Sequence, residues 1–315
     1  MTEPRKHEKY DALIYACHAL APIRTVVAHP CDDSSLTAVA EAAAAKIIKP
    51  ILVGPEARIR ALAASLHLDI GGFEVVDALH SQAAAEKAVQ LVRAGQADAL
   101  MKGSLHTDEL MAEVVRKDTG IRTARRVSHV FIMDVPTYAK PLFITDAAVN
   151  ISPTLEDKAD IVQNAIELAQ ALRISAPKVA ILSALETVSS KIPSTIDAAA
   201  LCKMAERGQI TGGVLDGPLA FDNAISREAA ATKHINSPVA GDADILLVPD
   251  LEAGNMLAKE LSFLANADAA GIVLGARVPI ILTSRADNLR TRMASCAVAA
   301  LYAHARRMAI GKLAG

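Results

Sequence analysis

Small and polar residues directly follow several short apolar runs of this 315-residue chain, and these are the residues that could do chemistry. Gly103-Ser104-Leu105-His106-Thr107 follows one such run, and Ser284-Arg285-Ala286-Asp287 follows another. A helix that begins after such a segment offers unpaired backbone N–H groups and the positive end of its dipole. The guanidinium of Arg285 adds a planar fork of donors that suits phosphate. The pattern predicts a site for anions such as phosphate, carboxylate or pyrophosphate.

The apolar runs that precede these segments predict short buried strands, and the stretches between them predict helices. The helix that begins near Leu155 has Thr154 as a cap and Asp157 three residues further on. Short strands that alternate with helices are typical of an α/β fold with a mostly parallel sheet, in which ligands bind at the carboxyl ends of the strands. The expected strands are 23–28, 50–54, 97–102, 142–146, 179–184, 213–215, 245–249 and 279–284.

Composition and missing motifs exclude several classes of protein. The net charge is −2 and Lys and Arg are spread along the chain, which disfavours nucleic-acid binding. The four cysteines lie far apart and predict neither a zinc site nor a disulfide framework. The charged N-terminus is no signal peptide and the apolar runs are too short to span a membrane, so we expect a cytoplasmic protein. The sequence contains no GxSxG elbow, P-loop, GxGxxG or HExxH motif, and we expect no metal.

Taken together, the polar segments resemble the phosphate acetyltransferase and phosphate butyryltransferase family. The resemblance covers nearly the whole chain in family order, and its most specific parts are the PDLEAGN and SRAD segments. Residues 216–222, DGPLAFD, resemble the butyryltransferase branch more than the acetyltransferase branch. The matching segments are Lys102–Thr107, Asp146–Asn150, Asp216–Asp222, Pro249–Asn255 and Thr283–Asp287.

Membership of this family would imply two three-layer α/β domains of the isocitrate/isopropylmalate dehydrogenase-like type, with mostly parallel sheets and a cleft between the domains. The first domain would comprise residues 1–147 and 288–315, and the second residues 148–287; of these limits, the residues themselves indicate only a turn near residue 150. The resemblance also implies a homodimer. The implied reaction is the reversible transfer of a short acyl group, acetyl to butyryl, between coenzyme A and inorganic phosphate. Coenzyme A is then a substrate, and no cofactor is expected.

The same resemblance gives roles to single residues. Ser284 and Arg285 would donate hydrogen bonds to the negatively charged tetrahedral state of the acyl carbon. In the acetyltransferases an Asp lies seven residues after that Ser, but this chain has Thr291 there. Asp287 is therefore the candidate general base, with Asp222 and Asp250 as alternatives. The expected substrate-binding residues are His106, Thr107, Arg126, Asn150, Asp216, Asp222, Asp250, Gly254 and Asn255.

Other readings of these residues remain open at the level of the sequence. Thr107 and Asn255 could cap helices, and Asp216 and Asp222 could stabilise turns. The absence of an Asp at position 291 also fits a domain that senses acyl-CoA without turning it over. A third possibility is a decarboxylating dehydrogenase-like enzyme on a similar fold, although the chain has no convincing carboxylate cluster for its metal.

Overall fold

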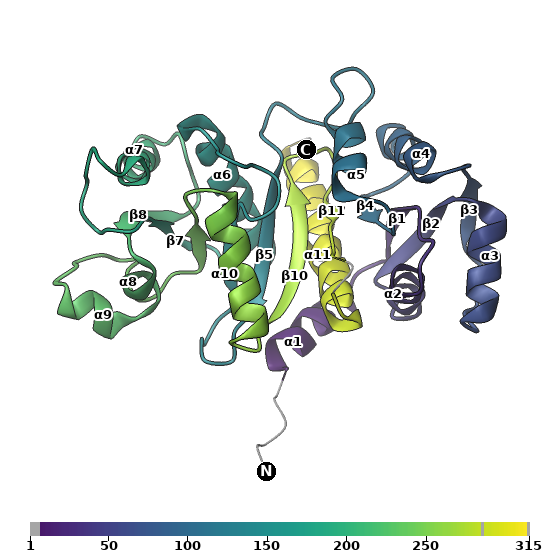
Figure 1. Cartoon of the computed structure of the whole chain (residues 1–315), viewed down its shortest axis with the longest axis horizontal. Coiled ribbons are helices and arrows are strands. Elements are labelled where there is room, and N and C mark those ends of the chain that lie inside the picture. The colour runs from purple at the N-terminus through teal and green to yellow at the C-terminus, as the bar shows by residue number, and fades with distance from the viewer. Residues whose placement is uncertain (1–6, 285–286, 314–315) are drawn as a thin grey trace, which may run out of the picture. The chain divides into compact units, whose positions relative to one another are not determined.

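The computed structural model describes residues 7–284 and 287–313, which divide into two compact units (Figure 1). One unit extends to Arg125 and takes up the chain again at Ala270, while the other comprises Arg126–Ala269. Both units are α/β structures with mostly parallel strands, as the sequence predicts.

The first unit has its strands in the order β3-β2-β1-β4-β11-β10. All neighbours in this order are parallel except β10 and β11, which are antiparallel. Helix α2 packs against α11, and α4 packs against α5 and the central strands. The strands are β1 (Ile23–Ala28), β2 (Ile48–Gly54), β3 (Glu74–Asp77), β4 (Ala99–Lys102), β10 (Asp268–Leu274) and β11 (Ile280–Ile281). The helices are α1 (Glu8–Cys17), α2 (Asp33–Ala44), α3 (Glu56–Ser65), α4 (Ser81–Arg93), α5 (Thr107–Val114) and α11 (Leu289–Leu313).

The second unit has the strand order β5-β6-β9-β7-β8, parallel except for the antiparallel pair β5 and β6. Its longest helix, α6, begins with the predicted capping box: the Thr154 hydroxyl accepts from the Asp157 N–H, and the Asp157 carboxylate accepts from the Thr154 N–H. The strands are β5 (Ser128–Asp134), β6 (Leu142–Thr145), β7 (Lys178–Leu182), β8 (Val214–Leu219) and β9 (Ile245–Leu247). The helices are α6 (Leu155–Ala171), α7 (Pro193–Glu206), α8 (Phe221–Ile225), α9 (Arg227–Thr232) and α10 (Leu251–Phe263).

The limits of the two units differ from the predicted domain limits of 147 and 287. Residues 126–147 belong to the second unit because β5 pairs with β6, and β6 pairs with β9. Residues 270–287 belong to the first unit because β11 pairs with β4 and β10 pairs with β11. Hydrogen bonds between strands distant in sequence therefore set both limits, and the turn near residue 150 is a turn inside the second unit.

All eight expected strands are present, β1 with the predicted ends and the others with different ends. The expected strand 279–284 is only Ile280–Ile281, so Thr283 and Ser284 already belong to the loop. The three strands that the sequence analysis did not identify are β3, β5 and β10. No helix among the described residues combines the length and the apolar character needed to cross a membrane.

Candidate functional site

The first unit brings three loops together at the carboxyl ends of β1, β4 and β11. Gly103 follows β4, and a Cβ atom there would lie 2.4 Å from the carbonyl oxygen of His29, so only glycine fits. The next residue, Ser104, donates to this oxygen from its backbone N–H at 2.8 Å and from its hydroxyl at 2.9 Å. The Ser104 hydroxyl also lies 2.9 Å from Nδ1 of His29. These contacts hold the loop after β4 against the loop after β1.

After β11, the structure describes two of the three predicted catalytic residues, Ser284 and Asp287. The Ser284 N–H donates to the Asp287 carboxylate at 2.6 Å, and the Asp287 N–H donates back to the Ser284 carbonyl at 3.2 Å. Ser284 is exposed, whereas Asp287 is partly buried. Burial raises the pKa of Asp287 above its ordinary value, although the Ser284 N–H and the charges of Arg292 and Lys102 act in the opposite direction. Arg285, the third predicted catalytic residue, lies outside the described residues.

The start of α11 explains what Thr291 does in place of the expected Asp. The side-chain oxygen of Asn288 accepts a hydrogen bond from the Thr291 N–H at 2.9 Å, which caps the helix. Thr291 is 8% exposed, and its carbonyl accepts from the Ser295 hydroxyl at 2.8 Å. Position 291 is thus part of the helix packing, while Asp287 precedes the cap and remains in the loop.

The predicted residues His106 and Thr107 lie at the start of α5, in the loop that follows β4. His106 is the N-cap residue, but its side chain makes no capping hydrogen bond, and it is exposed. Thr107 is the first residue of the helix and not its cap. Because β4 and β11 are parallel neighbours, with Leu100 opposite Ile280, both residues belong to the same sheet edge as Ser284.

In the second unit, Asn150 and Arg126 meet in a cluster around Asp146. One carboxylate oxygen of Asp146 accepts from the Ala148 and Val149 N–H groups at 2.9 and 3.0 Å. The other accepts from the Asn150 side-chain amide at 2.5 Å. The amide oxygen of Asn150 in turn accepts from Nε of Arg126 at 2.7 Å, and Arg126 keeps half of its side chain exposed. The cluster therefore presents a held guanidinium to solvent.

Three further predicted residues, Asp250, Gly254 and Asn255, bring α10 onto this cluster. Asp250 is the N-cap of α10, since its carboxylate accepts from the Ala253 N–H at 2.9 Å. The side-chain amide of Asn255, within α10, donates to the Ala147 carbonyl at 3.1 Å, so it holds this helix to the loop after β6 and does not cap a helix. A Cβ on Gly254 would lie 2.9 Å from the Asp146 carbonyl oxygen, which explains the glycine. The predicted residues Arg126, Asn150, Asp250, Gly254 and Asn255 thus form one group.

Asp216 and Asp222 do not occupy the turn that the sequence predicted after a strand 213–215. Strand β8 continues to Leu219 because its pairing with β7 extends from Ala180 opposite Asp216 to Leu182 opposite Leu219. Asp216 therefore lies within a strand. Asp222 lies in the first turn of α8, where its exposed carboxylate pairs with Lys233 at 3.3 Å.

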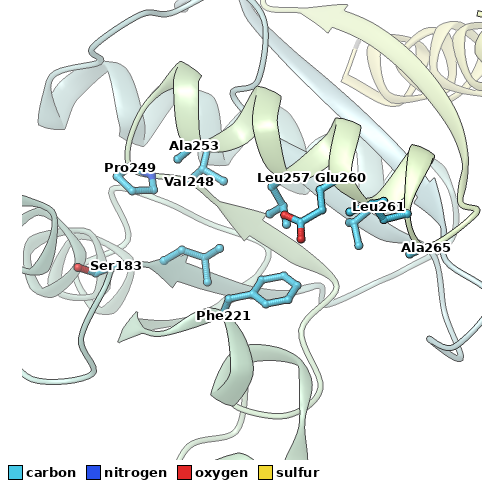
Figure 2. A pocket seen from close by; sticks show the side chains of 11 residues that line it. Ser183, Phe221, Val248, Pro249, Ala253, Leu257, Glu260, Leu261 and Ala265 are labelled. Atoms are coloured by element: carbon cyan, nitrogen blue, oxygen red, sulfur yellow. The ribbon is translucent and has the colours of Figure 1, made fainter.

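A separate apolar pocket of about 560 Å³ lies in the second unit on another face of α10 (Figure 2). Phe221 lies across the pocket from α10, and the Glu260 carboxylate is directed into the space between them. The remaining walls are formed by Leu182, Ser183, Val248, Pro249, Ala253, Leu257, Leu261, Leu264 and Ala265.

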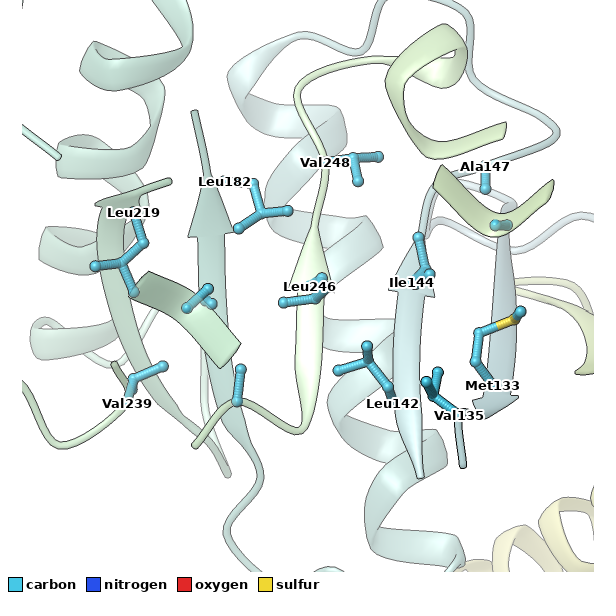
Figure 3. Packing of buried hydrophobic residues seen from close by; sticks show 14 residues of the cluster. Met133, Val135, Leu142, Ile144, Ala147, Leu182, Leu219, Val239, Leu246 and Val248 are labelled. Carbon is cyan, nitrogen blue, oxygen red and sulfur yellow. The ribbon is translucent and has the colours of Figure 1, made fainter. Parts of the chain in front are cut away.

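The floor of this pocket is the upper end of the hydrophobic core of the second unit (Figure 3). Leu182 and Val248 line the pocket and also belong to the core, together with Leu219 and Leu246. Burial of each large aliphatic side chain contributes about 1.5–3 kcal/mol to folding. The core therefore anchors the strand ends that position the loops around Asp146 and Asp250.

The sequence analysis did not assign a site role to three residues that now belong to these sites, Lys102, Arg292 and Asp146, although Lys102 and Asp146 begin two of the matching segments. All three are at least 95% buried, which is unusual for charged side chains. A charged residue at the end of an otherwise apolar strand is the signal that points to Lys102 and Asp146, and an Arg among the apolar residues of α11 points to Arg292. Among residues 7–284 and 287–313, no three His, Cys, Asp or Glu side chains are grouped where they could hold a metal ion.

Comparison with known proteins gives a consistent result. The family described as phosphate acetyl/butaryl transferase matches residues 81–300. A phosphate acetyltransferase of Rhizobium meliloti is 68% identical over 306 residues, 97% of each chain. A phosphate butyryltransferase of Clostridium beijerinckii is 41% identical over 94% of this chain and 98% of its own.

Solved structures agree with these relatives. A branched-chain phosphotransacylase from Enterococcus faecalis has a TM-score of 0.77 at 32% identity, with 90% of this chain and 99% of that chain covered. A phosphotransacetylase from Streptococcus pyogenes, at 23% identity, has the same fold with a TM-score of 0.81 over 95% of this chain and 99% of its own. The chain therefore belongs to the phosphate acetyl/butaryl transferase family and is a transferase.

Proposed function

We propose that this protein transfers a short acyl group, acetyl to butyryl, reversibly between coenzyme A and inorganic phosphate, with the loop after β11 as its catalytic centre. The observation that carries the assignment is Asp287. This carboxylate is partly buried, its pKa lies above the ordinary value, and it pairs with no cation at ion-pair distance within residues 7–284 and 287–313. Such a group can take up and release a proton during turnover.

In the direction of thioester formation, the Asp287 carboxylate accepts the proton of the coenzyme A thiol. The thiolate then attacks the acyl carbon of the acyl phosphate, and the new C–S bond produces a tetrahedral oxyanion. This oxyanion collapses, the bond to phosphate breaks, and phosphate leaves. In the reverse direction a phosphate oxygen attacks the thioester, and protonated Asp287 returns its proton to the departing thiolate. The thiol has an ordinary pKa of about 8.5, so a positioned carboxylate is an adequate base.

We assign the stabilisation of the oxyanion to the Ser284 hydroxyl and the Arg285 guanidinium. A donor that is directed at a developing oxyanion lowers the activation barrier by about 2.7–4 kcal/mol. For the anionic parts of the substrates we assign Arg126 in the second unit, since Asn150 at 2.7 Å and the Asp157 carboxylate at 3.5 Å hold its guanidinium while half of the side chain stays exposed. His106 and Thr107 at the start of α5 are the candidates in the first unit.

The decisive experiment is an acyl-CoA panel. Purified protein is supplied with phosphate and acetyl-, propionyl-, butyryl- or isobutyryl-CoA, and the phosphate-dependent release of the thiol is followed. Formation of acyl phosphate from at least one member is expected, and the panel also gives the acyl preference. Failure with every member would refute the proposal, and coenzyme A binding without turnover would select the sensing domain instead.

The remaining expectations concern assembly, fold type and location. We propose that the chain forms a homodimer through α10, because this helix exposes Met256 and Phe263 by 64% and 81% and its C-cap residue Leu264 is 82% exposed. Light scattering of the wild type and of Phe263→Glu tests this, and a monomeric wild type would contradict it.

We retain the isocitrate/isopropylmalate dehydrogenase-like fold type and a cytoplasmic location as part of the proposal. Structures of 4-hydroxythreonine-4-phosphate dehydrogenases share the fold with TM-scores of up to 0.56.

A further inference from the structure

Arg292, on the first turns of α11, is 3% exposed and reaches back to the loop that carries Ser284 and Asp287. Its guanidinium donates to the Ser284 carbonyl at 2.8 Å and to the Asp287 carbonyl at 3.3 Å. It also donates to the Thr283 hydroxyl at 3.1 Å. One side chain thus contacts three residues of a five-residue segment, and two of those contacts are to its backbone.

The fourth contact of Arg292 links the loop to the start of α2. The guanidinium donates to the Ser34 hydroxyl at 3.2 Å, and this hydroxyl donates to the Asp32 carboxylate at 3.1 Å. Asp32 is the N-cap of α2 and accepts from the Ser35 N–H at 2.7 Å. The loop is therefore tied through Arg292 to a helix that begins at the neighbouring carboxyl end of β1.

The charge of Arg292 has no direct counterpart. Within the described part of the chain no carboxylate lies at ion-pair distance from this guanidinium. Arginine stays charged in proteins, and a buried charge without a paired partner is expensive. The hydrogen bonds of this guanidinium go instead to neutral groups, those of the loop that carries Ser284 and Asp287 and the hydroxyl of Ser34.

We propose that Arg292 is a positioning residue for the acyl-transfer site, which holds the backbone of Ser284 and Asp287. This inference rests on the proposed function. It gives the guanidinium two separable tasks. Its planar set of donors fixes the positions of the Ser284 and Asp287 carbonyls. Its charge favours the ionised form of the Asp287 carboxylate, which the guanidinium does not contact directly.

The groups that face the Asp287 carboxylate come from three elements. Arg292 approaches from α11, Lys102 from the end of β4, and the Ser284 N–H from the loop itself. Burial opposes the ionised form, and all three groups favour it. Loss of the Arg292 charge removes one of the two cations that act on Asp287 within residues 7–284 and 287–313, and should shift the protonation of Asp287 to higher pH. A lysine at this position keeps the charge but loses the planar arrangement of donors.

The test compares Arg292→Lys and Arg292→Met with the wild type in phosphate-dependent thiol release across pH. Arg292→Lys should lower kcat about tenfold or more because the loop carbonyls are no longer held in place. KM for both substrates should change little, and the fall in rate at low pH, the acid limb of the pH profile, should stay at the same pH. Arg292→Met should lower kcat further and move the acid limb up by about one pH unit. Arg306→Met is the matched control, since this α11 guanidinium also donates to two backbone carbonyls, those of Ala276 and Arg277, in another loop.

Several outcomes would overturn the inference. One is wild-type kcat and an unmoved acid limb in Arg292→Met, and another is an equal loss in Arg306→Met. A loss that follows only the unfolded fraction, measured by thermal unfolding, would also overturn it. If Arg292→Met does not fold, Arg292→Lys decides alone, and an unchanged kcat then refutes the positioning role. No turnover in the wild type would refute the proposed function itself, whereas wild-type turnover with unaffected variants refutes only the role of Arg292.

Discussion

Asp287 in the first unit and Asp242 in the second show how differently two partly buried carboxylates can be used. Burial raises the pKa of Asp287, and its nearest contact is a backbone N–H. Asp242 contacts Lys178 at 2.6 Å and Lys140 at 3.0 Å, and hydrogen bonds from these ammonium groups lower its pKa to about 2. The same residue type therefore has pKa shifts of opposite sign.

The difference lies in the distance to the cations. Lysines in direct contact keep Asp242 charged at every physiological pH, and the network extends through Lys140 to Asp244 at 2.7 Å. Asp242 thereby connects the loop before β9 to the start of β7, which is a structural task. Around Asp287 the cations are close enough to influence it but do not contact it. Its proton can therefore be exchanged, as acyl transfer requires.

The largest effect on activity is expected from Asp287→Asn, which tests whether Asp287, unlike Asp242, exchanges a proton during turnover. The amide cannot accept the thiol proton, so kcat for thioester formation should fall by roughly 10²–10⁴-fold, the usual contribution of a general base. The free energy of unfolding should not fall at neutral pH. Because burial raises the pKa of this carboxyl in the folded protein, its ionised form favours the unfolded chain above the ordinary pKa. Steady-state kinetics and urea unfolding test the two statements.

The control for that experiment is Asp242→Asn, which should leave kcat per folded molecule unchanged. A kcat for Asp287→Asn within a few-fold of the wild type would show that another group accepts the proton. Asp250 was one of the two alternative bases that the sequence analysis named, with Asp222, but its carboxylate already accepts the Ala253 N–H as the cap of α10.

The second prediction concerns the pH dependence of the wild type. Only the ionised carboxylate accepts the thiol proton, so kcat/KM for thioester formation should be constant above the raised pKa of Asp287 and fall about tenfold per pH unit below it. The acid limb must lie above 3.8, the ordinary value for this group. Rates measured in overlapping buffers test this, and an acid limb that persists unchanged in the residual activity of Asp287→Asn would assign it to another group.

The third prediction is a moderate loss of stability in Asp242→Asn. The lowered pKa means that the ionised carboxylate stabilises the fold above about pH 3.8 and that this contribution is lost as the pH falls toward 2. Solvent screens the partly exposed group, so we expect the free energy of unfolding to fall by about 1 kcal/mol at pH 7. Urea unfolding at pH 7 and at pH 3 provides the measurement. A difference between variant and wild type that does not shrink at pH 3 would contradict the electrostatic explanation.

Sequence patterns predicted the fold well where strands are short, apolar and followed by polar loops. They did not identify β5 and β10, the two strands that run antiparallel to their neighbours β6 and β11. Whether a strand pairs with one close in sequence or far from it depends on hydrogen bonds that no local pattern contains. The pairs between strands far apart in sequence, β4 with β11 and β6 with β9, explain why both limits between the units differ from the predicted ones.

The candidate site was predicted in part for a related reason. Asn150 and Asn255 could be identified because polar groups that follow strands share one sheet edge. Arg292 and Lys102 lie next to that edge as well, but a helix and a strand supply them, where charged residues are usually exposed or paired. Only the coordinates show that they are buried beside Asp287.

The smallest effect is expected from Asp222→Asn, which extends the comparison to a third aspartate. A hydrogen bond from the Asn223 N–H is the main reason that the pKa of Asp222 is lowered, and its carboxylate pairs with Lys233 at the surface. Exposed pairs of this kind contribute little to stability because water screens them. We therefore expect no measurable change in unfolding and, since the charge is held in an exposed ion pair with Lys233, unchanged kcat and KM. A clear rise in KM for acyl-CoA would instead support the sequence assignment of Asp222 to the substrate site, and would mean that a carboxylate can serve this reaction from an exposed ion pair.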